Sequence, residues 1–189
     1  MPKLILIKHA SPFVIPGTPP EKWRLSDKGK EACVPLADAI KPLAPTVMVS
    51  SDEPKAMETS EIVAEHLGIS HETAEGLHEH DRSNVPHMRS GEFISYVELF
   101  FRKPHELVLG RETADKCADR FDRAVKDALA KYPDQTIAIV AHGTVLALFL
   151  AQRDRESDGF HWWRKLGLPS YVVLSLPELA IEKTVERVG

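Results

Sequence analysis

The chain has 189 residues, of which 43% are hydrophobic and 28% are charged, a composition that predicts one globular domain over residues 1–189. Its formal net charge is −4, so it lacks the basic field that attracts nucleic acid or an anionic membrane surface. Two cysteines, Cys33 and Cys117, are too few for a disulfide framework and favour a reducing compartment. Because Lys8 interrupts the apolar run at the N-terminus, we expect no signal peptide and a cytoplasmic protein.

Short apolar segments alternate with helix-like segments along the chain. Ser26 is the expected cap of a helix that runs to about residue 40, and Ser51 of another helix with Pro54 in its first turn and Gly68 past its end. Three apolar runs show no polar alternation, which is typical of parallel strands covered on both faces: residues 4–7, 47–49 and 137–140. The pattern predicts a three-layer α/β sandwich with a mainly parallel central sheet.

The second half continues this alternation. After Thr113, small and apolar residues recur at spacings of three and four, which predicts a helix over about residues 114–129 with one face on the sheet. Another helix is expected over residues 145–152. Two more strands are expected at residues 171–176 and 181–188, on either side of Pro177.

Two stretches fall outside the alternation. Residues 11–21 contain four prolines and a glycine, which predicts a restricted loop directly after His9. Residues 78–91 are polar and precede an amphipathic helix, so we expect an insertion over about residues 78–110 that roofs a site. Core packing explains most aromatic residues, but four are also candidates for a homodimer surface or an apolar substrate wall: Phe100, Phe101, Trp162 and Trp163.

Charged and titratable residues follow the three expected parallel strands. Ligands of an open parallel sheet bind beyond the carboxyl ends of its strands, where helix N-termini present free N–H groups. The first strand delivers Lys8 and His9. The second delivers Ser50 and Ser51 and is followed by Lys55, and the third delivers His142. Two ammonium groups and two imidazoles at one edge predict a small anion site, for which phosphate is the most suitable anion. Because a neutral imidazole there is a competent nucleophile, the pattern predicts phosphoryl transfer through a phosphohistidine.

Five short motifs carry a resemblance to a known family through their order and spacing. They are "LILIKHA" near the N-terminus, "LSDKG" at 25–29, "SSDEPKAMETSEIVAEHLG" from residue 50, "LHE" at 77–79 and "AHG" at 141–143. Over most of the chain, this set resembles the histidine phosphatase superfamily, also called the phosphoglycerate-mutase-like fold. The resemblance implies that fold and a reaction through a phosphohistidine.

The resemblance also implies roles for individual residues. His9 would attack phosphorus, and Glu79 would protonate the leaving group and then activate water. Asp81 or a neighbouring histidine stays open as an alternative proton donor. The implied reaction needs no metal and no organic cofactor. Phosphate would be held by Lys8, Lys55, His142, Ser11 and Gly143, and the rest of the substrate would meet His80, Arg82 and Arg89.

Three residues depart from the pattern of that family. Lys8 and Lys55 stand where it usually has arginines, and Ala10 stands where it has glycine. Lysine keeps the charge but loses the planar two-pronged donor, at a cost of about 1.5–3 kcal/mol if one charge-assisted hydrogen bond is lost per site. Ala10 would be strained only where a positive φ is required.

The activity that we expect is hydrolysis of a small phosphorylated metabolite. A phosphoglycerate mutase is one alternative, although a chain of this length has little insertion to seal the site from water. A phosphate-binding or protein-docking module that has lost turnover is the other, and the two lysines motivate it. A metal site at His71, His78 and His80 is disfavoured because no cysteine lies nearby, and a serine hydrolase because no Gly-x-Ser-x-Gly elbow occurs.

Overall fold

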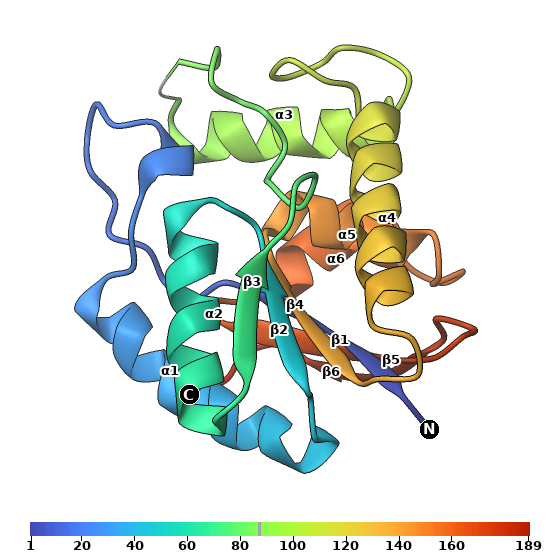
Figure 1. Ribbon diagram of the computed structural model, residues 1–189. Coiled ribbons are helices and arrows are strands. Elements are labelled where there is room, and N and C mark those ends of the chain that lie inside the picture. The colour runs from blue at the N-terminus through green and yellow to red at the C-terminus, as the bar shows by residue number, and fades with distance from the viewer. Residues whose placement is uncertain (87) are drawn as a thin grey trace.

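The computed structural model describes residues 1–86 and 88–189. Its middle layer is a six-stranded sheet in which the strands lie in the order β3-β2-β4-β1-β5-β6 (Figure 1). The strands are β1 (Lys3–Lys8), β2 (Val47–Ser50), β3 (Ser70–Thr73), β4 (Ile137–Ala141), β5 (Ser170–Ser175) and β6 (Ile181–Val185). The first four are parallel, and β5 and β6 add antiparallel strands beyond β1. The expected three-layer α/β sandwich with a mainly parallel sheet is confirmed.

Helices cover both faces of the sheet. They are α1 (Asp27–Ile40), α2 (Pro54–Leu67), α3 (Ser90–Arg102), α4 (Ala114–Lys131), α5 (Gly143–Ala151) and α6 (Gly159–Lys165), with 3-10 turns at Pro20–Lys22 and Lys41–Leu43. On one face α1 and α2 pack on Ile5 and Ile7, and on the other face α4, α5 and α6 pack on Leu4 and Leu6. Each central strand is therefore buried on both sides, which explains why its sequence shows no polar alternation.

One of the two expected helix caps is confirmed, and a third helix has a cap that the sequence analysis did not name. Ser26 accepts a hydrogen bond from the Gly29 backbone N–H at the start of α1, and Thr113 caps α4. The expected Ser51 cap is wrong, because α2 begins at Pro54 and the residue before it is Glu53. Proline at the first helical position needs no N–H partner, so α2 starts without a serine cap, and the Ser51 hydroxyl is available for other contacts.

Two elements were not expected from the sequence. Strand β3 has the polar sequence Ser-His-Glu-Thr and lies at the edge of the sheet, so no apolar run marks it. Helix α6 has only seven residues and begins after Asp158, whose carboxylate accepts the His161 backbone N–H. Of the four aromatic candidates, Phe100 and Trp162 are buried in the core and are therefore no surface for a dimer contact.

Helix α3 lies across the edge of the sheet where β1, β2 and β4 end (Figure 1). Val97 and Phe100 anchor this helix by their burial in the fold. Residue 87, within the expected roof of residues 78–110, lies outside the described residues. On the other flank of the same edge, the loop after His9 passes so close to α1 that a Cβ on Gly29 would lie 2.1 Å from the Ser11 carbonyl oxygen. Only glycine permits this approach, which fixes the course of the chain leaving the strand.

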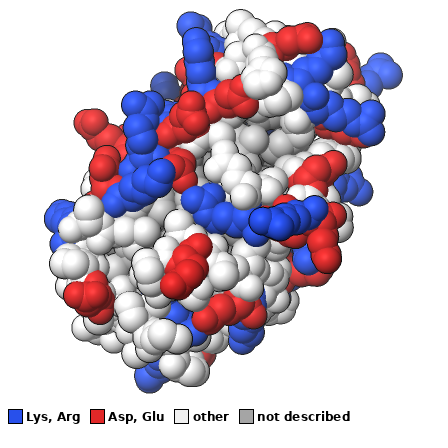
Figure 2. Space-filling view, turned by 90° about the vertical axis from the view of Figure 1, so that its right-hand side faces the viewer, with Lys and Arg blue, Asp and Glu red and all other residues white. Residues whose placement is uncertain are grey.

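The charged surface is mixed in sign. On the face shown in Figure 2, basic and acidic side chains are interspersed over an otherwise uncharged background. Across residues 1–86 and 88–189, we find no helix with the length and hydropathy needed to cross a bilayer.

Candidate active site

Two histidines face each other at the edge of the sheet beneath α3. Strand β1 ends at Lys8 and is followed by His9, and the parallel strand β4 ends at Ala141 and is followed by His142. The His9 backbone N–H donates to the Ala141 carbonyl at 3.1 Å, which extends the strand pairing as far as the two histidines. Their ring centroids are 5.1 Å apart, and both residues are buried. The parallel register of β1 and β4 therefore juxtaposes two residues that are far apart in the sequence.

The ring of His9 is oriented by the residue that follows it. Its Nδ1 lies 2.8 Å from the Ala10 carbonyl oxygen, and the Ala10 N–H donates to the Thr59 hydroxyl at 3.0 Å. A protonated Nδ1 that donates to this carbonyl leaves Nε2 with a free lone pair. Burial, with the charge of Lys55 second, lowers the pKa of His9 to about 3, so the ring is neutral at neutral pH. These are the properties of a histidine nucleophile.

Residue Ala10 adopts no left-handed conformation. In the described part of the chain, the non-glycine residues with positive φ are Ala44, Asp134 and Leu179. Alanine in the place of glycine therefore causes no backbone strain directly after His9.

The ring of His142 is held by Ser51 and has one unused donor position. Its Nε2 lies 2.9 Å from the Ser51 hydroxyl oxygen, which also accepts the Glu53 backbone N–H at 3.2 Å. Nε2 is the acceptor within reach of the Ser51 hydroxyl proton, and donation of that proton to Nε2 assigns the imidazole proton to Nδ1. Nδ1 is fully buried and has no hydrogen-bond partner among the described residues. A buried donor without a partner is costly, which points to a ligand that accepts from it.

Lys8 occupies space that Gly143 leaves free. A Cβ on Gly143 would lie 3.1 Å from the Lys8 Cε and 3.2 Å from its Nζ. The Lys8 ammonium donates to the Leu166 carbonyl at 2.7 Å. Burial lowers the pKa of Lys8 from 10.5 to about 8; Glu79 opposes this effect and Arg187 adds to it. Lys8 thus places an ammonium group at the N-terminus of α5, and the pKa of this group lies only slightly above neutral pH.

The second lysine is paired inside the site. Lys55 is 5% exposed, donates to the Pro20 carbonyl at 2.9 Å, and forms a buried ion pair with Glu53. The other carboxylate oxygen of Glu53 accepts the Glu79 backbone N–H at 2.8 Å and lies 3.6 Å from the His142 Nε2. Burial raises the pKa of Glu53 above its usual value, although the charge of Lys55 opposes this. A carboxylate therefore lies among the cations that the sequence analysis assigned to phosphate.

Glu79 reaches the N-terminus of α5. Its carboxylate accepts backbone N–H bonds from Thr144 at 3.0 Å, Val145 at 3.3 Å and His80 at 2.8 Å, and lies 3.7 Å from Arg82. Burial alone would raise the pKa of Glu79, but Arg82 and the backbone N–H donors outweigh it and hold that pKa below its usual value. Glu79 is therefore ionised in the empty site, and a bound dianion would favour its protonation.

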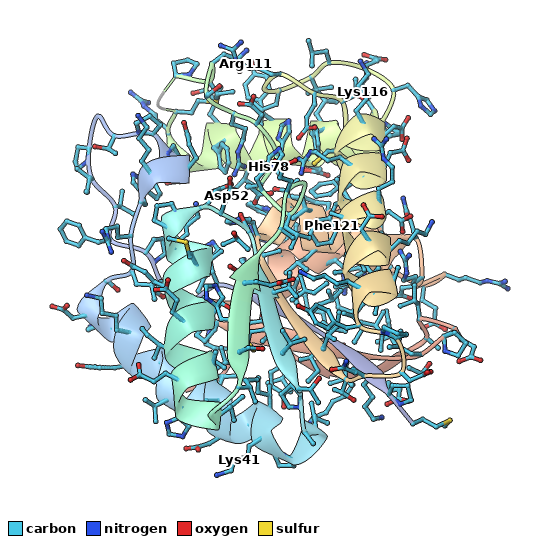
Figure 3. The ribbon with its side chains drawn as sticks, in the orientation of Figure 1. Lys41, Asp52, His78, Arg111, Lys116 and Phe121 are labelled. Atoms are coloured by element: carbon cyan, nitrogen blue, oxygen red, sulfur yellow. The ribbon has the colours of Figure 1, made fainter. Side chains whose placement is uncertain are left out.

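Two cavities meet at these residues. The larger, of about 570 Å³, extends from His9 toward the proline-rich loop and is also lined by Asp52 and His78, which Figure 3 shows beneath α3. The smaller, of about 300 Å³, extends toward α6 and is lined by Lys8, Gly143 and Trp163. His9, Glu79 and Arg82 line both cavities. The candidate nucleophile, His9, and the candidate proton donor, Glu79, thus lie where the two cavities join.

The structure brings most of the predicted site residues together. His80 lines the larger cavity, and its ring packs in a tilted arrangement against that of Phe100 with a centroid distance of 4.3 Å. Three predicted residues are not among those that line either cavity: Ser11, His142 and Arg89. Ser11 uses its carbonyl to accept from Ser26, His142 is fully buried next to His9, and Arg89 is exposed before α3. Sequence reasoning missed two contributors, Glu53 and Thr59. Both lie inside the motif from residue 50 that carried the resemblance, but nothing in the local sequence marked either of them as part of the site.

The three histidines considered as metal ligands have separate surroundings. His71 lies on β3 with its Nε2 3.3 Å from the Ser50 hydroxyl, whereas the His80 Nε2 contacts the Glu112 carbonyl at 3.2 Å. Among residues 1–86 and 88–189, no group of three or more His, Cys, Asp or Glu side chains is arranged to hold a metal ion.

Fold and geometry together define an α/β protein with two facing histidines and two lysines at the carboxyl edge of its parallel strands. The chain belongs to the histidine phosphatase superfamily, branch 1, whose family model matches residues 19–182. The matched range begins after the Lys8-His9-Ala10 segment, so the geometry described above, and not the family match, places that segment in the site. No curated protein matches the sequence.

Solved structures with the same fold include three proteins from different organisms. YhfR of Bacillus stearothermophilus has a TM-score of 0.78 and 20% identity, covering 100% of this chain and 98% of that one. A mycobacterial glucosyl-3-phosphoglycerate phosphatase in complex with VO3 has a TM-score of 0.74 and 20% identity, covering 97% of each chain. A phosphoserine phosphatase of Entamoeba histolytica in complex with 3-phosphoglyceric acid has a TM-score of 0.78 and 16% identity, covering 99% of this chain and 98% of that one. At these identities the likeness shows the fold.

Proposed function

We propose that the protein is a phosphomonoester hydrolase that acts through a phosphohistidine at His9. The observation that carries the proposal is the pairing of His9, neutral and with Nε2 free, with the unpartnered and fully buried Nδ1 of His142 across 5.1 Å between ring centroids. A phosphoryl group between the two rings would accept from His142 and be open to attack by His9. Two of the proteins with the same fold are named as phosphatases, which agrees with this reaction.

In the first step, the lone pair of the His9 Nε2 forms a bond to phosphorus while the bond from phosphorus to the leaving oxygen breaks. Lys8, Lys55 and the His142 Nδ1–H would hold the phosphoryl oxygens, whose charge changes as the group moves. Protonated Glu79 donates its proton to the leaving oxygen, and the alcohol departs. This step requires Glu79 to be protonated. The negative charge of the bound substrate favours the protonated form of a carboxyl group beside it.

In the second step, water attacks phosphorus and Glu79 accepts a proton from it. The bond between phosphorus and the His9 nitrogen breaks, which releases inorganic phosphate and restores the neutral imidazole. Glu79 ends the step protonated and returns this proton to solvent when phosphate leaves, because its carboxylate is ionised in the empty site. The backbone N–H groups of Thr144 and Val145 would keep its carboxyl in place throughout.

The larger cavity supports a small phosphorylated metabolite as the substrate. Its volume of about 570 Å³ lies in the range typical of small-molecule sites, and it opens from His9 beneath the loop that carries Glu79. His80 and Arg82 line this space and are the proposed contacts for the leaving group.

A phosphate-binding module without turnover is the second candidate. The Glu53–Lys55 ion pair favours it, because this pair offsets the charge of one of the two lysines in the empty site. Such a module would bind phosphoesters and release no phosphate.

The test is phosphate release from a panel of phosphomonoesters by the wild type and His9→Ala, with acid-quench detection of labelled phosphohistidine. His66→Ala is the matched control, since His66 pairs with Asp38 on the surface away from both cavities. We expect turnover and label in the wild type and in the control, and neither in His9→Ala. Phosphoester binding with no turnover and no label in the wild type would indicate the non-catalytic module. Interconversion of phosphoglycerate isomers without release of phosphate would indicate a mutase.

A further inference from the structure

Glu53 is the one buried carboxylate in the site to which the proposed reaction gives no role. Glu53 is 8% exposed, and the two oxygens of its carboxylate contact groups from three different parts of the chain. One oxygen pairs with the Lys55 ammonium on α2. The other accepts the Glu79 backbone N–H at 2.8 Å and faces the His142 Nε2 at 3.6 Å.

These contacts connect the expected phosphate ligands to the expected proton donor. Lys55 and His142 belong to the group that would hold the phosphoryl oxygens, and the Glu79 backbone belongs to the segment that carries the general acid. A single side chain therefore sets the relative position of three participants. Its negative charge also opposes the binding of a phosphate dianion a few ångströms away, because like charges in a poorly solvated site repel strongly.

We propose that Glu53 is a positioning residue which holds Lys55 and the Glu79 segment in the empty site and takes up a proton when a phosphate dianion binds. The inference rests on the proposed function, since it assumes that the anion bound beside His9 is phosphate. Proton uptake removes the repulsion and frees Lys55 to face the anion, while the neutral carboxyl can still accept the Glu79 N–H. The proton comes from solvent, and it is released again when phosphate leaves. The groups that face this carboxyl are Lys55, His142 and Glu79. Burial already biases Glu53 toward its protonated form.

The experiment is calorimetric titration of inorganic phosphate at pH 7.5 in buffers of different ionisation enthalpy, which counts the protons taken up on binding. The variant is Glu53→Gln, and the matched control is Glu58→Gln. Glu58 is also 8% exposed but accepts from Arg24 and the Leu25 backbone N–H, away from both cavities. Changes in the protonation of phosphate itself, of Lys8 and of Glu79 are common to all three proteins and cancel in the differences.

We expect Glu53→Gln to take up close to one proton fewer than the wild type and to bind phosphate at least about tenfold more tightly, because one negative charge is gone. The control should match the wild type in both quantities. Equal proton uptake in Glu53→Gln and the wild type would overturn the inference while leaving the proposed function standing. Failure of the wild type to bind phosphate at all would overturn the proposed function, and with it this inference.

A second variant keeps the test decisive if Glu53→Gln does not fold. Replacing both partners, Glu53→Gln with Lys55→Gln, leaves no unpaired buried charge and is the gentler change. Thermal unfolding followed by circular dichroism identifies the folded proteins. The double variant should also lose close to one proton of uptake, and unchanged uptake in it would likewise overturn the inference.

Discussion

Replacement of Lys8 by arginine should remove a pH dependence that burial creates. The Lys8 pKa falls from 10.5 to about 8, which corresponds to roughly 3 kcal/mol at about 1.4 kcal/mol per pKa unit. Above pH 8 the free enzyme therefore loses this cation, and the affinity for a dianionic substrate falls by about tenfold per pH unit. A guanidinium stays charged over the whole accessible range.

The assay is kcat/KM from pH 6 to 10 with a phosphomonoester that is a dianion throughout most of that range, because kcat/KM reports the titration of the free enzyme. The ratio of kcat/KM for Lys8→Arg to that of the wild type should be constant below pH 8 and rise about tenfold per pH unit above it. The sign follows from the lowered pKa, since the protonated form binds the dianion and is lost as pH rises.

The matched control is Lys3→Arg, whose side chain pairs with Glu182 at the far end of β1. Its ratio to the wild type should stay near one at every pH. If the ratio for Lys8→Arg does not change between pH 7 and 10, deprotonation of Lys8 is not the cause of the fall in kcat/KM of the wild type above pH 8. A severe loss at every pH would show instead that the site is shaped around lysine.

Three further substitutions test the remaining geometry. Glu79→Gln should slow substrates with poor leaving groups by about 10²–10⁴-fold and good leaving groups much less, because only the former need the proton; equal slowing would remove Glu79 as the general acid. Ser51→Ala should lower kcat/KM by about threefold to tenfold through loss of the bond that orients His142, whereas Ser95→Ala on the exposed side of α3 should leave it unchanged. Gly29→Ala places a Cβ 2.1 Å from the Ser11 carbonyl oxygen, so it should destabilise the fold by about 1–3 kcal/mol in chemical denaturation; wild-type stability would show that the loop after His9 yields freely.

Much of the architecture could be predicted from local sequence. The runs at residues 4–7, 47–49 and 137–140 identified the central strands because a strand covered on both faces must be apolar throughout. Ser26 marked a helix start because its hydroxyl accepts a free N–H group of the first turn. The order of these elements was enough to place Lys8, His9 and His142 at one edge.

Other features could not be read from local pattern. Strand β3 is polar and receives its hydrogen bonds only from β2, so its sequence carries no signal of its own. Helix α6 was not predicted for the same reason, because its short sequence carries no clear helical pattern. It is stabilised by the Asp158 cap and by the packing of Trp162 in the core.

The site shows the same division. By itself, the sequence determined which chemical groups arrive at the sheet edge, because strand ends and helix starts are local properties. Only the tertiary structure decided that Glu53 is buried against Lys55 and His142, that Ser51 leaves one His142 nitrogen free, and that Lys8 is close to titration. Each of these depends on desolvation and on neighbours far away in the chain. Charge state is therefore a property of the packed fold, whereas the identity of the groups is a property of the sequence.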